Sequence, residues 1–81
     1  MIIILGWREG YCLDGTGADQ NTGQLPLGKK ASEEECLEEC KKNEKATGCE
    51  FIAGINCFVH TKEVASASGS QKASACLVFP G

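Results

Sequence analysis

The sequence predicts an α+β fold in which one α-helix packs on a small antiparallel β-sheet that disulfides hold together. Three observations support this class: the 81 residues include six cysteines, a helix-capping signal starts at Ser32, and short apolar segments at 49–60 and 76–79 are typical of strands. The chain is expected to form one domain, residues 1–81. Two cores of about forty residues each would be too small to fold without help.

The cysteines predict disulfides and an oxidising compartment. An even number of cysteines in a short chain is typical of a secreted, cross-linked framework. No Cys-x-x-Cys pair occurs, so thiol redox catalysis is not expected. The six residues are Cys12, Cys36, Cys40, Cys49, Cys57 and Cys76.

Metal binding is the alternative use of these cysteines, and their spacing disfavours it. Zinc sites pair two thiolates a few residues apart with a second such pair or with two histidines. Cys36 and Cys40 fit a first pair, whereas Cys49 and Cys57 are too far apart for a second, and His60 is the only histidine. The acidic and amide residues between positions 14 and 21 lack the EF-hand spacing for calcium. We therefore expect no metal and no other cofactor.

The chain is expected to be secreted, without membrane insertion and without nucleic-acid binding. Its net charge of −3 disfavours attraction to phosphate. No apolar stretch approaches the roughly 20 residues that cross a bilayer. Met1–Trp7 lacks the basic start and the cleavage site of a signal peptide, so we expect a mature domain released from a longer secreted precursor.

The first third of the chain predicts one buried strand and one long loop. Ile2–Leu5 is a β-branched run, which favours a strand because branched side chains are stiff at χ1. Gly10–Gly28 is rich in Gly, Asp, Thr, Asn and Gln around Pro26. That composition is typical of a turn-rich loop, anchored here only by Cys12.

A helix is predicted to begin after Ser32, whose hydroxyl can accept a hydrogen bond from the backbone N–H three residues later. Glutamates crowd its first turns, and Lys41, Lys42 and Lys45 are placed in its last, an arrangement that complements the helix dipole. Gly48 lies beyond its end, where a helix stop is expected.

The second half predicts two further strand regions that would lie beneath this helix. Cys36 and Cys40 are four residues apart, so both should face whatever the helix packs against. Cys49–His60 predicts a tight β-hairpin or a bulged pair of strands, Thr61–Ala75 predicts a mobile loop, and Cys76–Phe79 predicts a closing strand.

Four cysteines and a phenylalanine follow the pattern Cys36-x3-Cys40-x8-Cys49-x-Phe51-x5-Cys57, with a capped acidic helix before it and a strand after it. This pattern resembles the PAN/apple domain family, and the outer pair of cysteines matches the bridge that ties the termini in the apple subset. The resemblance implies the disulfides Cys12–Cys76, Cys36–Cys57 and Cys40–Cys49, one of fifteen connectivities that six cysteines allow.

No enzyme is predicted. Catalysis needs a nucleophile with a base, a carboxylate pair in a cleft or a bound metal, and the chain offers one histidine and glutamates on a solvated helix. His60 follows the apolar Val59 and is expected to be an ordinary strand residue.

The resemblance instead implies an extracellular recognition or adhesion module that binds carbohydrate or protein. A neutral sugar would need an exposed aromatic ring with polar neighbours, whereas a sulfated glycan would need clustered lysines. Trp7 is favoured as a core residue over a ligand contact because the chain has few aromatic residues. The candidate ligand-binding residues are Trp7, Arg8, Tyr11 and Asp14 for a neutral sugar, and Lys29 and Lys30 for a sulfated glycan.

A function from a different class is the alternative. A free secreted effector, such as a toxin, a protease inhibitor or a signalling polypeptide, could use the same cross-linked scaffold. In that case the Gly10–Gly28 loop would contact the target, because loops on rigid scaffolds often carry function.

Overall fold

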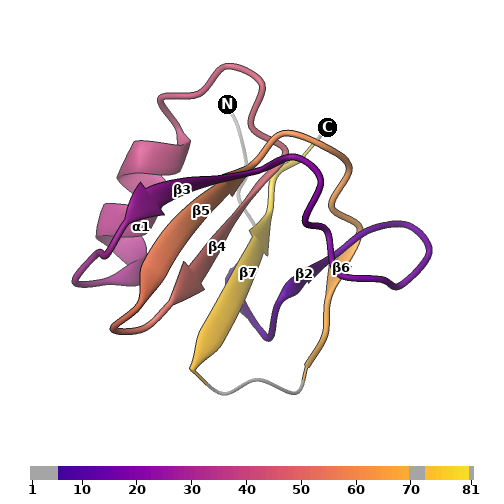
Figure 1. Cartoon of the computed structure of the whole chain (residues 1–81), viewed down its shortest axis with the longest axis horizontal. Helices are drawn as coiled ribbons and strands as arrows, with labels where there is room; N and C mark the ends of the chain where they lie inside the picture. The colour runs from indigo at the N-terminus through magenta and orange to yellow at the C-terminus, as the bar shows by residue number, and fades with distance from the viewer. Residues whose placement is uncertain (1–5, 70–72, 81) are drawn as a thin grey trace.

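The computed structural model describes residues 6–69 and 73–80, which form one helix, a five-stranded antiparallel sheet and a two-stranded antiparallel sheet (Figure 1). The larger sheet has the strand order β1-β7-β4-β5-β3, and the smaller one pairs β2 with β6. The predicted class, one helix on an antiparallel sheet with three disulfides, is confirmed. The elements are β1 (Arg8–Glu9), β2 (Cys12–Leu13), β3 (Gln24–Gly28), α1 (Glu33–Cys40), β4 (Gly48–Ile52), β5 (Asn56–His60), β6 (Ser66–Ala67) and β7 (Ser74–Val78).

α1 begins where the sequence predicts. Ser32 has the extended backbone of an N-cap, and its Oγ accepts a hydrogen bond from the backbone N–H of Glu35 at 3.2 Å. Three glutamates occupy the first turn, where negative charge complements the helix dipole. Among the described residues, no helix has the length and apolar character that a membrane span requires.

The helix ends earlier than predicted, at Cys40, and its last turn contains no basic residue. The lysines predicted for the last turn therefore follow the helix, and Gly48 begins β4 instead of stopping α1. Asn43 gives the physical reason, because its Oδ1 accepts the backbone N–H of Lys45 at 2.9 Å and this local turn competes with helical hydrogen bonding.

The predicted hairpin and the predicted final strand are both present, and the final strand lies inside the sheet. β4 and β5 pair with Cys49 opposite Val59 and Phe51 opposite Cys57, across a turn that contains Gly54 at φ 76°. β7 pairs with β4 on one side and with β1 on the other. The last strand of the chain therefore lies inside the sheet, between β1 and β4.

The prediction that Gly10–Gly28 is a loop is wrong at its two strands, Cys12–Leu13 and Gln24–Gly28. β2 pairs with β6, with Cys12 opposite Ala67, and β3 forms an edge of the larger sheet beside β5. The turn-rich composition did not indicate these strands, because each pairs with residues far away in the sequence. Between β2 and β3 the chain projects beyond the sheet, on the side of the molecule opposite α1 (Figure 1).

The predicted loop Thr61–Ala75 likewise contains secondary structure. β6 lies within it, and β7 begins at Ser74, two residues earlier than the predicted strand. The predicted strand Ile2–Leu5 lies outside the described residues.

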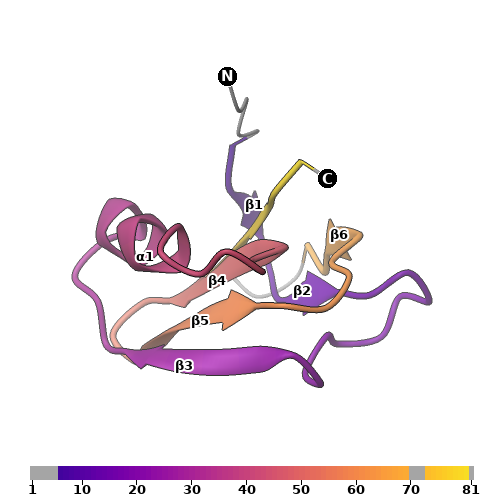
Figure 2. The same cartoon turned by 90° about the horizontal axis from the view of Figure 1, so that it is seen from above.

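The five-stranded sheet has two differently covered faces. α1 covers one face, over β4, β5 and β3 (Figure 2), and the buried side chains there are apolar or disulfide-bonded. On the other face a smaller cluster contains Cys12, Val64 and Cys76. Side chains alternate along each strand, so a residue between two core residues of β4 faces the second side. The core of the helix-covered face comprises Cys36, Cys40, Cys49, Phe51, Cys57, Val59 and Leu77.

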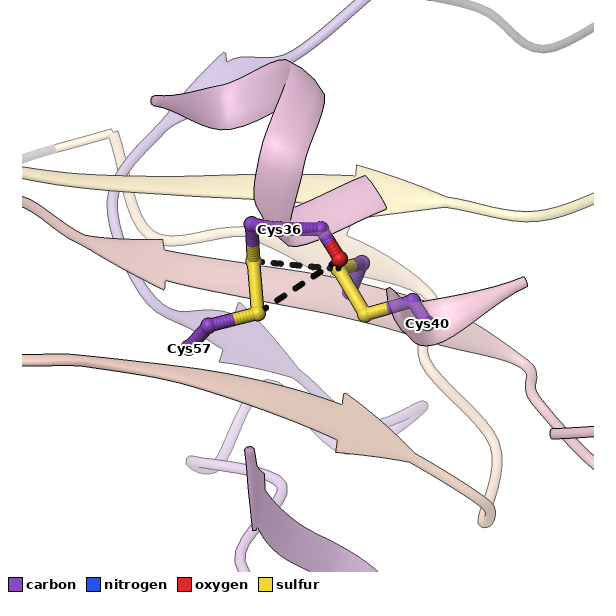
Figure 3. A group of neighbouring side chains, drawn as sticks. Cys36, Cys40 and Cys57 are labelled. Carbon is purple, nitrogen blue, oxygen red and sulfur yellow. Dashed lines mark hydrogen bonds between the residues drawn. A yellow bond between two sulfur atoms is a disulfide. The ribbon is translucent and has the colours of Figure 1, made fainter. Parts of the chain in front are cut away.

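The three disulfides have the predicted pairing. Cys36 bonds to Cys57 and Cys40 to Cys49, so both cysteines of α1 are tied to the hairpin beneath it (Figure 3). Cys12 bonds to Cys76 across 64 positions of sequence and joins β2 to β7. The helix-covered face and the opposite face therefore have separate cross-links.

Candidate functional site

A cavity of about 220 Å³ lies on the sheet face opposite α1. Residues of β4 and β5 form one wall, and the other consists of Tyr11, Cys12, residues 19–21 and Gln24 at the start of β3. Part of the segment that the sequence predicts as a loop therefore lines the cavity. The lining residues are Tyr11, Cys12, Asp19, Gln20, Asn21, Gln24, Glu50, Ile52 and Phe58.

Glu50 is the buried charged residue of this cavity, with 4% of its surface exposed. It stands between Cys49 and Phe51 on β4, and strand alternation turns it to the face away from the helix. Its Oε1 accepts the backbone N–H of Cys12 at 2.9 Å and lies 3.3 Å from His60 Nε2. No hydrogen bond from the described residues reaches the other oxygen, Oε2.

His60 fixes the position of this carboxylate. Its side chain is fully buried, and among the described residues its Nδ1 has no hydrogen-bond partner. The neutral tautomer with hydrogen on Nε2 satisfies the contact with Glu50 and leaves Nδ1 as an acceptor, so no buried N–H lacks a partner. His60 therefore donates to Glu50 from behind the cavity and is not among the residues that line it.

Neither cluster of potential metal ligands in the described residues fits a metal in the oxidised protein. Cys12, Glu50 and His60 come within 4.8 Å of one another, but the Cys12 sulfur is bonded to Cys76 and cannot act as a thiolate. Two ligands remain, fewer than a zinc site requires. The four sulfurs beneath α1 are equally close, and all four belong to disulfides (Figure 3).

The wall formed by the β2–β3 connection is held by Gln20, which is itself buried. Its side-chain Nε2 donates to the carbonyl oxygen of Glu63 at 2.6 Å, and its Oε1 accepts the Thr22 hydroxyl at 2.7 Å. Its backbone N–H donates to the carbonyl oxygen of Cys12 at 3.0 Å. The side-chain amide of Gln20 is therefore hydrogen-bonded within the protein and holds this wall in place.

Gly23 allows the same wall to approach the end of β5. A Cβ at this position would lie 2.8 Å from the backbone nitrogen of Lys62 and 2.9 Å from the Thr61 hydroxyl. The carbonyl oxygen of Gly23 accepts the backbone N–H of Thr61 at 2.9 Å. The close approach therefore depends on the absence of a side chain.

Other polar side chains of the cavity are free to bind a ligand. Asp19 and Asn21 are exposed, and Gln24 is half-buried. Within the described residues, none of these three side chains takes part in a hydrogen bond, and the same holds for the Tyr11 hydroxyl. The rings of Tyr11 and Phe58 supply apolar surface beside these groups. The cavity combines aromatic surface, unused hydrogen-bonding groups and a buried carboxylate, which is the composition of a small polar-ligand site.

Of the six ligand-binding residues that the sequence predicts, only Tyr11 lines this cavity. Trp7 packs against the helix-side core, with its ring centroid 6.5 Å from that of Phe51 and the two rings at 68°. Arg8 is exposed on β1. Lys29 and Lys30 lie between β3 and α1, away from the cavity. The structure therefore does not bring the six candidates together.

Asp14 stabilises the projecting turn. Its Oδ1 accepts the Thr16 hydroxyl at 2.6 Å, the Thr16 backbone N–H at 2.8 Å and the Ala18 N–H at 3.2 Å. The hydrogen bond from the Thr16 hydroxyl is the largest cause that lowers the pKa of Asp14 below its ordinary value. Asp14 is thus a turn-forming residue and lies outside the cavity.

A larger, shallower depression of about 660 Å³ lies between the end of α1 and β3. It is lined by Leu25, Pro26, Leu27 and Val59 together with charged side chains such as Lys42. No buried charged group lies in it, whereas Glu50 is buried at the smaller cavity. We therefore treat the smaller cavity as the candidate site.

No protein-family model, no curated protein and no solved structure matches the chain. The PAN/apple resemblance stays a prediction that depends on the spacing of the cysteines and Phe51.

Sequence reasoning missed most of the cavity, including Glu50, Asp19, Asn21, Gln24 and Phe58. One available signal was Glu50 itself, a charged residue between Cys49 and Phe51 in an otherwise apolar segment. In a strand with one solvated face such a residue is ordinarily exposed. The additional layer formed by β2 and its connection is what buries Glu50.

Proposed function

We propose that this protein is an extracellular, non-catalytic recognition module of the PAN/apple type, and that it binds carbohydrate in the cavity of Tyr11 and Glu50. The observation that carries the proposal is the cavity itself. It places two aromatic rings beside polar groups that make no hydrogen bonds with the described residues. Sugars are recognised by this combination, because a ring packs on the pyranose face and polar groups bind the hydroxyls.

The three disulfides support both the PAN/apple type and an extracellular location. The pairing of all six cysteines follows the pattern that the resemblance implies. A domain of this size with three disulfides suits an oxidising environment.

The burial of His60 and the disulfide bond of Cys12 support a non-catalytic role. His60 is fully buried, so its ring has no exposed surface for substrate contact, and Cys12 is disulfide-bonded. In the described part of the chain, no second buried carboxylate lines the cavity with Glu50. Asp19 lines the same cavity but is exposed at its edge.

NMR titration of the oxidised, ¹⁵N-labelled protein with a panel of monosaccharides and disaccharides tests the proposal. We expect the shifted amides to cluster around the cavity, at residues 11, 19–24, 50 and 58. Tyr11→Ala should weaken binding by about fivefold, because a ring contact is lost. Arg8→Ala is the matched control on exposed β1 and should leave affinity unchanged. The proposal is contradicted if none of the sugars binds, or if the shifted amides cluster at Lys29 and Lys30.

A further inference from the structure

The charged residues that line the cavity have the same sign. Asp19 stands at the edge and Glu50 at the buried side, and no lysine or arginine is among the lining residues. Cavity walls of low polarizability strengthen the field of such carboxylates. The cavity is therefore an electronegative site.

The buried carboxylate has one oxygen left for a ligand. Oε1 of Glu50 is used by the Cys12 N–H and by His60, whereas Oε2 receives no hydrogen bond from the described residues. His60 Nε2 lies 3.3 Å from Oε1, so the histidine does not occupy Oε2. Among the described residues, the buried side-chain polar atom without a partner is His60 Nδ1, so Glu50 Oε2 is accessible from the cavity and can accept a charged hydrogen bond from a cationic donor.

The aromatic residues favour the same kind of ligand. Tyr11 and Phe58 line the cavity together with the two carboxylates. The faces of aromatic rings attract cations, and this attraction increases where water is excluded. An ammonium group therefore matches both the charges and the rings.

The size of the cavity limits the ligand. Its volume of about 220 Å³ is below the roughly 300–1,000 Å³ that is usual for drug-sized ligands. Asn21 and Gln24 leave amide groups for hydroxyl partners beside the carboxylates. A single sugar ring fits these features better than a long chain.

We propose that the cavity selects a monosaccharide that carries a free primary ammonium group, such as an unacetylated hexosamine, over its neutral and N-acetylated counterparts. This inference rests on the proposed carbohydrate-binding function and specifies its ligand. Glu50 Oε2 and Asp19 accept the ammonium hydrogens, Tyr11 and Phe58 contact the ring, and the free amides bind hydroxyls.

The test compares D-glucosamine, D-glucose and N-acetyl-D-glucosamine, together with propylamine, by NMR titration of the oxidised protein near neutral pH. We expect glucosamine to bind about tenfold more tightly than either other sugar, because charged hydrogen bonds exceed neutral ones in strength. Propylamine should bind more weakly than glucosamine, because it has no hydroxyl groups.

Two variants report on the carboxylates. Glu50→Gln is isosteric, keeps an acceptor oxygen for Cys12 and His60, and should abolish the preference for glucosamine over glucose and N-acetylglucosamine. Asp19→Asn changes an exposed residue and should reduce the preference about twofold. This second variant gives an answer even if Glu50→Gln fails to fold.

The failures of the two proposals are distinguishable. Equal affinity for the three sugars would overturn the ammonium preference and leave carbohydrate binding in place. Absence of binding to every sugar would overturn the proposed function. Propylamine binding as tight as that of glucosamine would overturn the assignment of the ligand to a sugar.

Discussion

His60 Nε2 lies 3.3 Å from Glu50 Oε1, and both side chains are buried on the sheet face away from the helix. The register explains this contact. His60 on β5 stands opposite Gly48, which has no side chain, and Glu50 is two residues further along β4. Diagonal neighbours on one face of an antiparallel pair are within reach of long side chains. Because Glu50 also lines the cavity, this contact links the buried His60 to the proposed ligand site.

Removing His60 alone should cost more stability than removing His60 together with the charge of Glu50. His60→Leu leaves the buried Glu50 carboxylate without its side-chain partner, and we expect the free energy of unfolding to fall by about 2–4 kcal/mol. The double variant Glu50→Gln, His60→Leu should recover at least about 1 kcal/mol of that loss, because no buried charge remains and the amide oxygen at position 50 still accepts the Cys12 N–H. Chemical denaturation with the disulfides intact measures both. A double variant less stable than His60→Leu would show that the pair makes no such contribution.

The disulfides should contribute unequally to stability. Cys12–Cys76 closes a loop of 64 positions and Cys40–Cys49 one of 9. Loop entropy then predicts losses of about 4 and about 2.5 kcal/mol on replacing each pair with alanines. Denaturant unfolding of the two double variants, with mass-spectrometric mapping of the remaining bridges, measures the order. An equal or reversed order would argue against loop entropy as the main contribution.

The close approach at Gly23 should be sensitive to a single methyl group. Gly23→Ala places a Cβ against Lys62 and Thr61, so we expect a loss of about 1–3 kcal/mol and NMR shifts along the cavity wall. Gly6→Ala is the control, because a Cβ there meets no atom within 4 Å. Similar stability of the two variants would show that the wall can move without cost.

Ionised Asp14 should stabilise the fold only above acidic pH. Its pKa is lowered in the folded state, chiefly by the Thr16 hydroxyl, so its contribution is present above the unfolded-state pKa and is lost as the pH falls through the folded-state pKa. The stability difference between the natural protein and Asp14→Asn should therefore be constant near neutral pH and shrink in acid. A carboxyl ¹³C titration locates the midpoint, and a midpoint at or above the ordinary aspartate value would contradict the assignment.

The helix start and the hairpin could be predicted from sequence because their causes are local. The Ser32 cap acts on a backbone N–H three residues away, and the two strands of Cys49–His60 are separated by a short turn. The pairing of the cysteines came from the PAN/apple resemblance, since six cysteines by themselves allow fifteen pairings.

The sequence alone determined the helix start, the hairpin and the even number of cysteines. Tertiary structure decided the position of β7 inside the sheet, the layer formed by β2 and β6, and the burial of Glu50 beside His60. These depend on contacts between residues distant in the chain, such as Cys12 with Glu50. Local composition carries no record of such pairings, so a segment that resembles a solvated loop became one wall of the cavity.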